Sequence, residues 1–285
     1  MATTARRGLA LGILAIAACG DPEPPPKPPQ PQPQEEAIAS RAREPGPARR
    51  GLWVLCEGSQ RILEHPERFD ALLADANRLA VTDLFVQVYR GGRAWFDSSK
   101  ADAAPHRAIL EQTGRDTLAE LIPRAHAAGL SVHAWVNVLS LAGNTSAPLL
   151  RLLGPEAVLV DNRGRSILDY PNRDVPEPDR AYYRMGTPAV WLDPAAPGVA
   201  PHLAETVSEL LVRYPELDGL HLDYIRYPDV LPFVPGSRFG VGLDFGYGEA
   251  TRARFRKDTG LEAPAIRALP NPKLANRWDA WRRDQ

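Results

Sequence analysis

The chain has 285 residues, of which 44% are hydrophobic and 24% charged, a composition typical of one large globular domain or two small ones. Lysines and arginines number 34 against 35 aspartates and glutamates, so the formal net charge is −1. This balance speaks against a nucleic-acid-binding protein, which usually carries a basic excess. The 29 prolines are the one unusual count, and many of them lie near the N-terminus.

The first 18 residues are predicted to be a signal peptide. Arg6 and Arg7 precede the apolar run 9–18, which is too short to span a bilayer as a mature helix. The run leads into Ile-Ala-Ala-Cys, which resembles a bacterial lipobox. We therefore expect Cys19 to be lipidated after export and to anchor the protein to a membrane of the cell envelope. The alternative is an ordinary signal peptide followed by an incidental cysteine.

Residues 19–49 are expected to form the anchor and a linker. Residues 21–36 read DPEPPPKPPQPQPQEE and contain no apolar side chain to bury. Proline-rich segments of this kind form semi-rigid polyproline II spacers. The folded domain is then expected at residues 50–285. Its single cysteine, Cys56, has no partner for a disulfide within the domain, and we expect its thiol to be buried.

Apolar strands and amphipathic helices alternate along this domain. The first half is predicted to contain a strand at 51–57, a helix at 66–80, a strand at 83–89, a polar loop at about 90–113, a helix that ends at Gly129 and a strand at 131–138. The second half is predicted to contain an elaborated loop at 139–192 with a small hairpin at 158–167, a helix at 197–214, a strand at 218–226, a glycine-rich loop at 236–248 and helices at 249–258 and 275–285. This order is typical of an α/β fold with a parallel sheet covered by helices.

Polar side chains gather at the predicted ends of the four strands. Functional groups in a parallel β/α array lie where strands end and the following loops begin. Side chains alternate along a strand, so His221 and Asp223 are expected on one face of theirs. The candidates from the four strands, in order, are Glu57; Gln87, Tyr89 and Arg90; His133, Trp135 and Asn137; and His221, Asp223, Tyr224, Arg226 and Tyr227.

Several of these residues have an equally simple structural interpretation. His133 and His221 could be hydrogen-bonded core residues, and Arg226 could pair with Asp223. Trp135 could pack in the core or stack on a sugar ring. Asp223 is the strongest functional candidate, because a carboxylate at the end of an apolar strand is costly unless it is paired or used.

The sequence contains no motif for a cofactor or metal. A nucleophile elbow, a P-loop, a dinucleotide fingerprint and a dense His/Cys cluster are all missing from it. Carboxylate chemistry is therefore the leading enzymatic interpretation. Glycoside hydrolysis usually requires two carboxylates that flank the scissile bond.

Four segments in succession resemble one known family. They are DLFVQVYRGGRAWFDS, HAAGLSVHAWVNV, WLDPAAPGVAPHLAETVSELLVRY and LDGLHLDYIRYP, within residues 51 to about 285. They resemble the glycosyl-hydrolase-like family 10, found in bacterial lipoproteins. The resemblance implies a (β/α)8 TIM-type barrel, an exported protein and, for some members, cell-wall glycan as substrate. Asp223 matches the acidic residue of the fourth-strand motif, and the resemblance implies that it acts as the nucleophile, as the corresponding carboxylate of related barrel glycosidases often does, or as the acid/base.

Two functional hypotheses follow. Four strand candidates against the eight of a barrel predict that only the N-terminal half or so of the barrel is present, with Glu57 as the one obvious second carboxylate. The first hypothesis is a lipid-anchored glycoside hydrolase acting on a polysaccharide such as peptidoglycan glycan strands. Substrate contacts would come from His221, Arg226, Tyr224, Asn137, Trp135, Gln87, Arg90 and Trp95. The alternative is a non-catalytic carbohydrate-binding or scaffolding lipoprotein, or an inactive truncated product.

Overall fold

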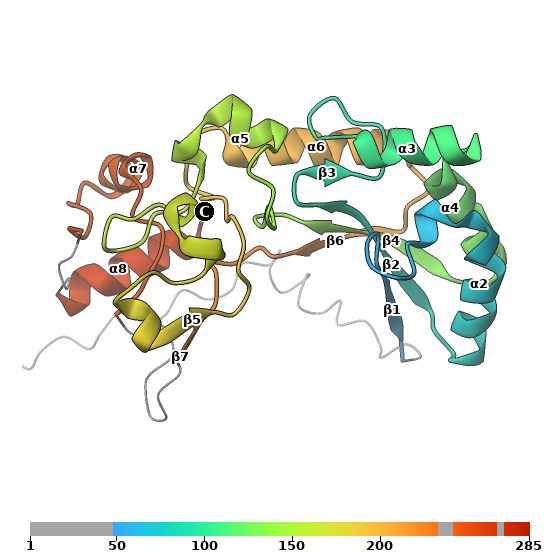
Figure 1. The fold of residues 1–285 in the computed structure, drawn as a ribbon, viewed down its shortest axis with the longest axis horizontal. Coiled ribbons are helices and arrows are strands. Elements are labelled where there is room, and N and C mark those ends of the chain that lie inside the picture. Colours follow the sequence, from blue (N-terminus) through green and yellow to red (C-terminus); the bar gives the residue numbers. More distant parts are fainter. Residues whose placement is uncertain (1–47, 233–241, 267–270) are drawn as a thin grey trace, which may run out of the picture. The chain divides into compact units, whose positions relative to one another are not determined.

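The four long strands form one parallel sheet in their chain order (Figure 1). The computed structural model describes residues 48–232, 242–266 and 271–285; the expected signal peptide, Cys19 and most of the linker lie outside these ranges. The strands are β1 (Gly51–Val54), β2 (Asp83–Arg90), β4 (Ser131–Asn137) and β6 (Gly219–Asp223). All belong to one compact unit, Arg49–Gln285.

Each of these strands is joined to the next by a helical crossover. The crossovers contain α2 (Phe69–Arg78), α4 (Thr117–Ala127) and α6 (Val199–Arg213). Parallel strands that neighbour one another in sequence order are the arrangement of a (β/α) barrel, whereas a doubly wound sheet reverses its order at a switch point. The predicted fold class is confirmed. Among the described residues, β1 and β6 are the two ends of the parallel order, so these strands do not close a barrel.

The two faces of the sheet differ in chemistry. One face carries aliphatic side chains that are almost completely buried: Leu84, Val86, Val132 and Ala134. The other carries rings, among them Trp53, Phe85, His133 and His221. Phe85 lies at the centre of these rings, with ring-centroid distances of 5.0 Å to Trp53 and 4.9 Å to His133. The Trp53 side chain nevertheless remains 53% exposed, so this aromatic face is only partly covered.

One close approach explains a glycine at the start of β6. A Cβ at Gly219 would lie 2.5 Å from Nδ1 of His133 on the neighbouring strand. The ring of His133 therefore occupies the space that a larger residue would need. Nε2 of His133 in turn lies 2.7 Å from Oδ1 of Asp83 at the beginning of β2, which ties three strands together at this edge.

Two α-helices and several shorter elements were not predicted from the sequence. The predicted polar loop contains β3 (Arg93–Ala94) and α3 (Ala104–Thr113), whose apolar face is narrow because only His106 and Ile109 are buried. Pro105 in its first turn is compatible with a helix start. The segment before α6 contains α5 (Pro148–Leu153) and β5 (Tyr183–Met185), which pairs with β7 (Val230–Pro232). The short 3-10 helices are Ile62–Glu64, Pro66–Arg68, Pro155–Ala157, Ile167–Asp169, Pro171–Arg173 and Asp179–Ala181.

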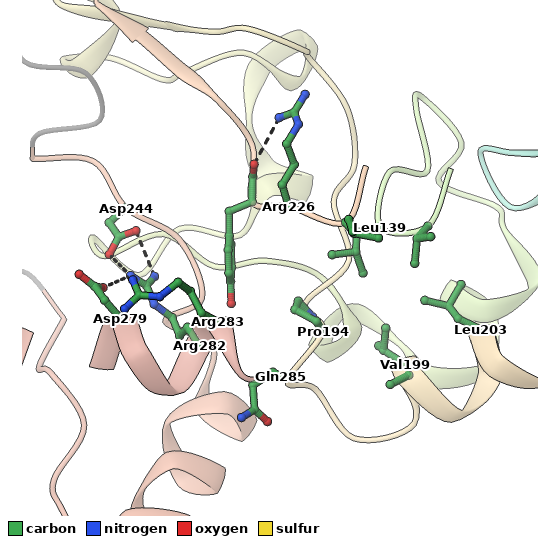
Figure 2. A pocket seen from close by; sticks show the side chains of 14 residues that line it. Leu139, Pro194, Val199, Leu203, Arg226, Asp244, Asp279, Arg282, Arg283 and Gln285 are labelled. Carbon is green, nitrogen blue, oxygen red and sulfur yellow. Dashed lines mark hydrogen bonds and ion pairs between the residues drawn. The ribbon is translucent and has the colours of Figure 1, made fainter. Parts of the chain in front are cut away.

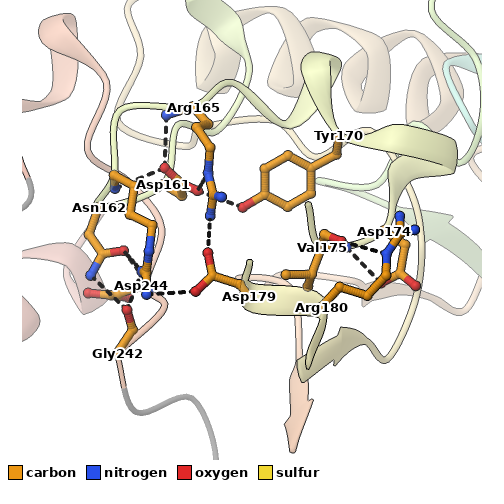
Figure 3. A network of polar contacts seen from close by, with 11 residues as sticks. Asp161, Asn162, Arg165, Tyr170, Asp174, Val175, Asp179, Arg180, Gly242 and Asp244 are labelled. Carbon is orange, nitrogen blue, oxygen red and sulfur yellow. Dashed lines mark hydrogen bonds and ion pairs between the residues drawn. The ribbon is translucent and has the colours of Figure 1, made fainter. Parts of the chain in front are cut away.

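A buried ion-pair network organises the long segment between β4 and α6 (Figure 3). Asp161 is fully buried, and its Oδ2 accepts hydrogen bonds from Arg165 Nε at 2.7 Å and Tyr170 Oη at 2.8 Å. Arg165 also pairs with Asp179 at 2.7 Å. The predicted hairpin is reduced to one antiparallel bridge, between Val160 and Ser166. Polar contacts therefore take the place of a regular ladder in this segment.

The last two helices form a second, smaller core. They are α7 (Glu249–Thr259) and α8 (Pro272–Arg283), and they bury Phe255, Trp278 and Trp281. Both were predicted, with slightly different ends. The guanidinium of Arg282 pairs with Asp244 at 2.9 Å and Asp279 at 2.5 Å. Of the predicted glycine-rich loop 236–248, residues 236–241 lie outside the described residues.

Candidate functional site

The carboxyl ends of the four parallel strands carry a row of polar side chains. Three hydrogen-bonded groups follow one another from β1 to β6, centred on Glu57, Gln87 and Asp223. Each group contains at least one residue that was predicted from the sequence to be functional. The row lies at the end of the sheet where parallel β/α folds place their active sites.

Glu57 follows β1 and is engaged by two arginines. One carboxylate oxygen accepts a hydrogen bond from Arg93 Nη2 at 2.5 Å, and the other pairs with Arg90. Arg93 also lies over the ring of Trp95, 5.8 Å from its centroid, and Trp95 is only 3% exposed. Arg93 was not among the residues predicted from the sequence. In the Arg90-Gly91-Gly92-Arg93 turn, the sequence gives no reason to choose one arginine over the other.

The middle of the row is a buried chain of neutral groups. Cys56 Sγ donates to Gln87 Oε1 at 3.1 Å, and Gln87 Nε2 donates to Asn137 Oδ1 at 3.3 Å. All three side chains are buried, and burial raises the pKa of the Cys56 thiol above its usual range. The expectation that Cys56 is a buried, unpaired cysteine is confirmed.

Asp223 ends β6 and accepts one hydrogen bond on each carboxylate oxygen. Trp135 Nε1 donates to Oδ2 at 3.0 Å, and the backbone N–H of Tyr224 donates to Oδ1 at 2.7 Å. His221 lies on the same side of the strand, with its ring centroid 6.4 Å from that of Trp135. The expected alternation of His221 and Asp223 is therefore present.

Arg226 does not pair with Asp223, contrary to one alternative of the sequence analysis. Its Nη1 lies 2.8 Å from Oδ2 of Asp229. Its guanidinium carbon lies 5.3 Å from the ring centroids of both Trp191 and Tyr224. The contact of Trp191 with Arg226 was not predicted from the sequence, because Trp191 stands at the end of an irregular segment with no periodicity.

A pocket of about 660 Å³ opens beside the ends of β4 and β6 (Figure 2). Its walls combine aliphatic side chains with charged ones, as Figure 2 shows for Leu139, Val199 and Leu203 and for Arg226 and Arg282. Of the side chains nominated for substrate contact, Arg226 is the one that lines this pocket. Val138, another lining residue, donates its backbone N–H to the Asp223 carbonyl at 2.8 Å, so the pocket lies next to the strand end that carries Asp223.

The part of the chain that the structure describes contains neither a candidate metal site nor a helix that could span a membrane. No group of three or more His, Cys, Asp or Glu side chains there could hold a metal ion. No helix in those residues is both long and apolar enough to cross a membrane.

Comparison with known proteins places the chain in a family. The profile of the family described as glycosyl hydrolase-like 10 matches residues 48–285. The chain is similar to glycosyl hydrolase DigH of Escherichia coli strain K12 and of Shigella flexneri, at 28% identity over 187 residues in each case. That alignment covers 64% of this chain and 39% of the relative, so the chain spans about two fifths of the length of these relatives.

Solved structures with some likeness to the chain are more distant. A hypothetical protein from Ruminiclostridium thermocellum has 16% identity and a TM-score of 0.40, covering 83% of this chain and 92% of its own. The catalytic domain of beta-amylase from Paenibacillus polymyxa has 12% identity and a TM-score of 0.47, covering 82% of this chain and 58% of its own.

Proposed function

Because the chain belongs to the glycosyl hydrolase-like 10 family, we propose that it is a glycoside hydrolase module in which Asp223 supplies the reacting carboxylate. One observation carries the proposal. Asp223 lies at the carboxyl end of β6, and among the described residues it has a single donor on each oxygen and no ion-pair partner, so its charge is held in place by neutral groups. A carboxylate held in this way remains able to act as a nucleophile or base.

The substrate we propose is a polysaccharide, with peptidoglycan glycan strands as the first to test. Carbohydrate is supported by the family and by a pocket with aliphatic and charged walls next to the strand end that carries Asp223. Peptidoglycan is supported by the lipobox-like segment before Cys19, since a lipid-anchored envelope protein meets that polymer first.

Glu57 fits a structural role better than the role of second carboxylate. Its two oxygens are engaged by Arg90 and Arg93. In the strand order β1-β2-β4-β6, it follows the strand at the opposite end of the parallel order from the strand that carries Asp223. The assignment of Glu57 to catalysis stays a prediction, and this geometry also favours the alternative of carbohydrate binding without turnover.

The test is release of reducing ends from purified glycan strands by the full chain. We expect Asp223→Asn to abolish release while its circular dichroism spectrum and unfolding midpoint stay close to those of the wild type. Asp75→Asn, on the exposed surface of α2, is the matched control and should retain full activity. Equal rates for the wild type and Asp223→Asn would refute the catalytic role. Sedimentation with insoluble glycan without any release would support the binding alternative.

We further propose that the protein is exported and anchored through a lipid on Cys19. Arg6, Arg7, the apolar run 9–18 and the Ile-Ala-Ala-Cys sequence support this. Metabolic labelling with an alkyne-bearing fatty acid should mark the wild type and Cys56→Ser, but not Cys19→Ser. Label that persists in Cys19→Ser would overturn the proposal.

A further inference from the structure

The hydrogen bond between Trp135 and Asp223 indicates a role for this tryptophan other than stacking on a sugar ring, the role that its residue type suggests. Exposed tryptophans at strand ends often stack on sugar rings. Trp135 is only 8% exposed, and its indole N–H is directed at Oδ2 of Asp223, 3.0 Å away. A ring so fully covered offers no open face to a sugar.

The sheet register fixes this pairing. Trp135 lies opposite His221 and Asn137 lies opposite Asp223 in the parallel ladder of β4 and β6. The indole therefore reaches diagonally along the same face to the next inward residue of the neighbouring strand. The ring of His221, 6.4 Å away at an interplanar angle of 66°, packs beside it and restricts its movement.

A strained residue holds the other oxygen of the carboxylate. Tyr224 has φ 55°, in the left-handed region, which costs roughly 1 kcal/mol or more for a residue other than glycine. This turn directs its N–H back to Oδ1 of Asp223. Three contacts stabilise it: the N–H of Leu139 donates to the Tyr224 carbonyl at 3.2 Å, and the Tyr224 ring packs against Trp191 and Arg226.

We propose that Trp135 is a positioning residue that orients the Asp223 carboxylate through its indole N–H, and that it does not serve as a sugar-stacking platform. This inference rests on the proposed function of Asp223. Two N–H donors, one on each oxygen, fix the plane of the carboxylate. A nucleophile or base needs its oxygens in place before a substrate arrives.

The experiment replaces Trp135 by Phe, which keeps an aromatic ring and removes the N–H. Hydrogen bonds to charged groups are worth enough that we expect kcat to fall about tenfold or more. KM for glycan strands should stay within about twofold, since the ring does not contact the substrate.

Trp53→Phe is the matched control. Trp53 lies on the same aromatic face but is more than half exposed, and Asp223 receives no hydrogen bond from it. We expect its kcat to stay within about twofold of that of the wild type. A raised KM with an unchanged kcat in Trp135→Phe would overturn the inference, because that is the signature of a lost stacking platform.

A second readout does not depend on turnover. Difference infrared spectra of protein labelled with 13C-aspartate, with Asp223→Asn as the subtraction, isolate the carboxylate stretching bands of Asp223. The separation of the two bands should change in Trp135→Phe even if no substrate is ever hydrolysed, because one oxygen loses its donor. Unchanged bands would refute the positioning role. If Trp135→Phe fails to fold, benzothienylalanine at position 135, isosteric with Trp but lacking the N–H, gives the same comparison.

Discussion

The carboxylate of Asp83 is predicted to be the main polar contributor to the stability of the sheet at its amino-terminal edge. Asp83 is 5% exposed at the start of β2. It accepts hydrogen bonds from Arg49 Nε at 2.9 Å and Thr82 Oγ1 at 2.5 Å, and it contacts His133 Nε2 at 2.7 Å. The hydrogen bond from Arg49 holds the pKa of this carboxyl well below its usual range.

The substitution Asp83→Asn keeps the side-chain volume but replaces a carboxylate oxygen, which accepts hydrogen bonds, with an NH2 group, which can only donate. Hydrogen bonds to a buried charged group contribute about 1.5–3 kcal/mol each, whereas the mostly exposed Arg49 adds less because water screens it. We expect a loss of about 3 kcal/mol in the free energy of unfolding, equivalent to a fall of roughly 6–12 °C in Tm for a domain of this size.

The sign of the pH dependence follows from the direction of the pKa shift. The folded-state pKa is depressed, so the contribution of Asp83 is fully present above its unfolded pKa of about 3.9. It is lost as the pH falls from that value toward the folded pKa. The stability gap between wild type and Asp83→Asn should therefore be constant from about pH 7 to about pH 5 and shrink below about pH 4.

Urea unfolding followed by tryptophan fluorescence measures this gap at each pH. Asp75→Asn is the control, because Asp75 forms an exposed ion pair with Arg78 and should change stability by no more than about 0.5 kcal/mol. Equal unfolding midpoints for the two variants, or a gap that stays constant below about pH 4, would contradict the reasoning.

Two further predictions concern a close backbone approach and a buried carboxylate. Gly219→Ala should cost about 1–3 kcal/mol in urea unfolding, because the new Cβ would lie 2.5 Å from His133, whereas Gly143→Ala, with open space around it, should be nearly neutral; equal costs would count against the close approach. Burial raises the pKa of Asp193, so ionisation of this carboxyl lowers the stability of the folded state. This cost is absent below the unfolded pKa and grows as the pH rises through the folded pKa. Asp193→Asn should therefore gain stability relative to the wild type as the pH rises from about 4 to about 8, and a flat or falling difference would exclude this.

The alternation of apolar strands and helices predicted the parallel sheet, because the spacing of apolar residues that marks a strand or a helix is a local property of the chain. Strands 83–89 and 131–138 were recognised within one residue of β2 and β4, since both consist of nearly continuous buried side chains. The helix α3 was missed because it buries only His106 and Ile109, too little for a clear period. Its position is fixed by tertiary contacts rather than by amphipathicity.

The same distinction applies to the site. Local alternation and the chain order of the strands were enough to expect Asp223 and His221 on one face at a strand end. The chain could not reveal by itself that Arg226 pairs with Asp229, that Glu57 binds two arginines or that the indole of Trp135 faces Asp223. Each depends on side-chain direction and on which strand ends become neighbours. Periodicity along one segment therefore determined which residues stand at the strand ends, and only packing between segments decided which of their charges form ion pairs and which do not.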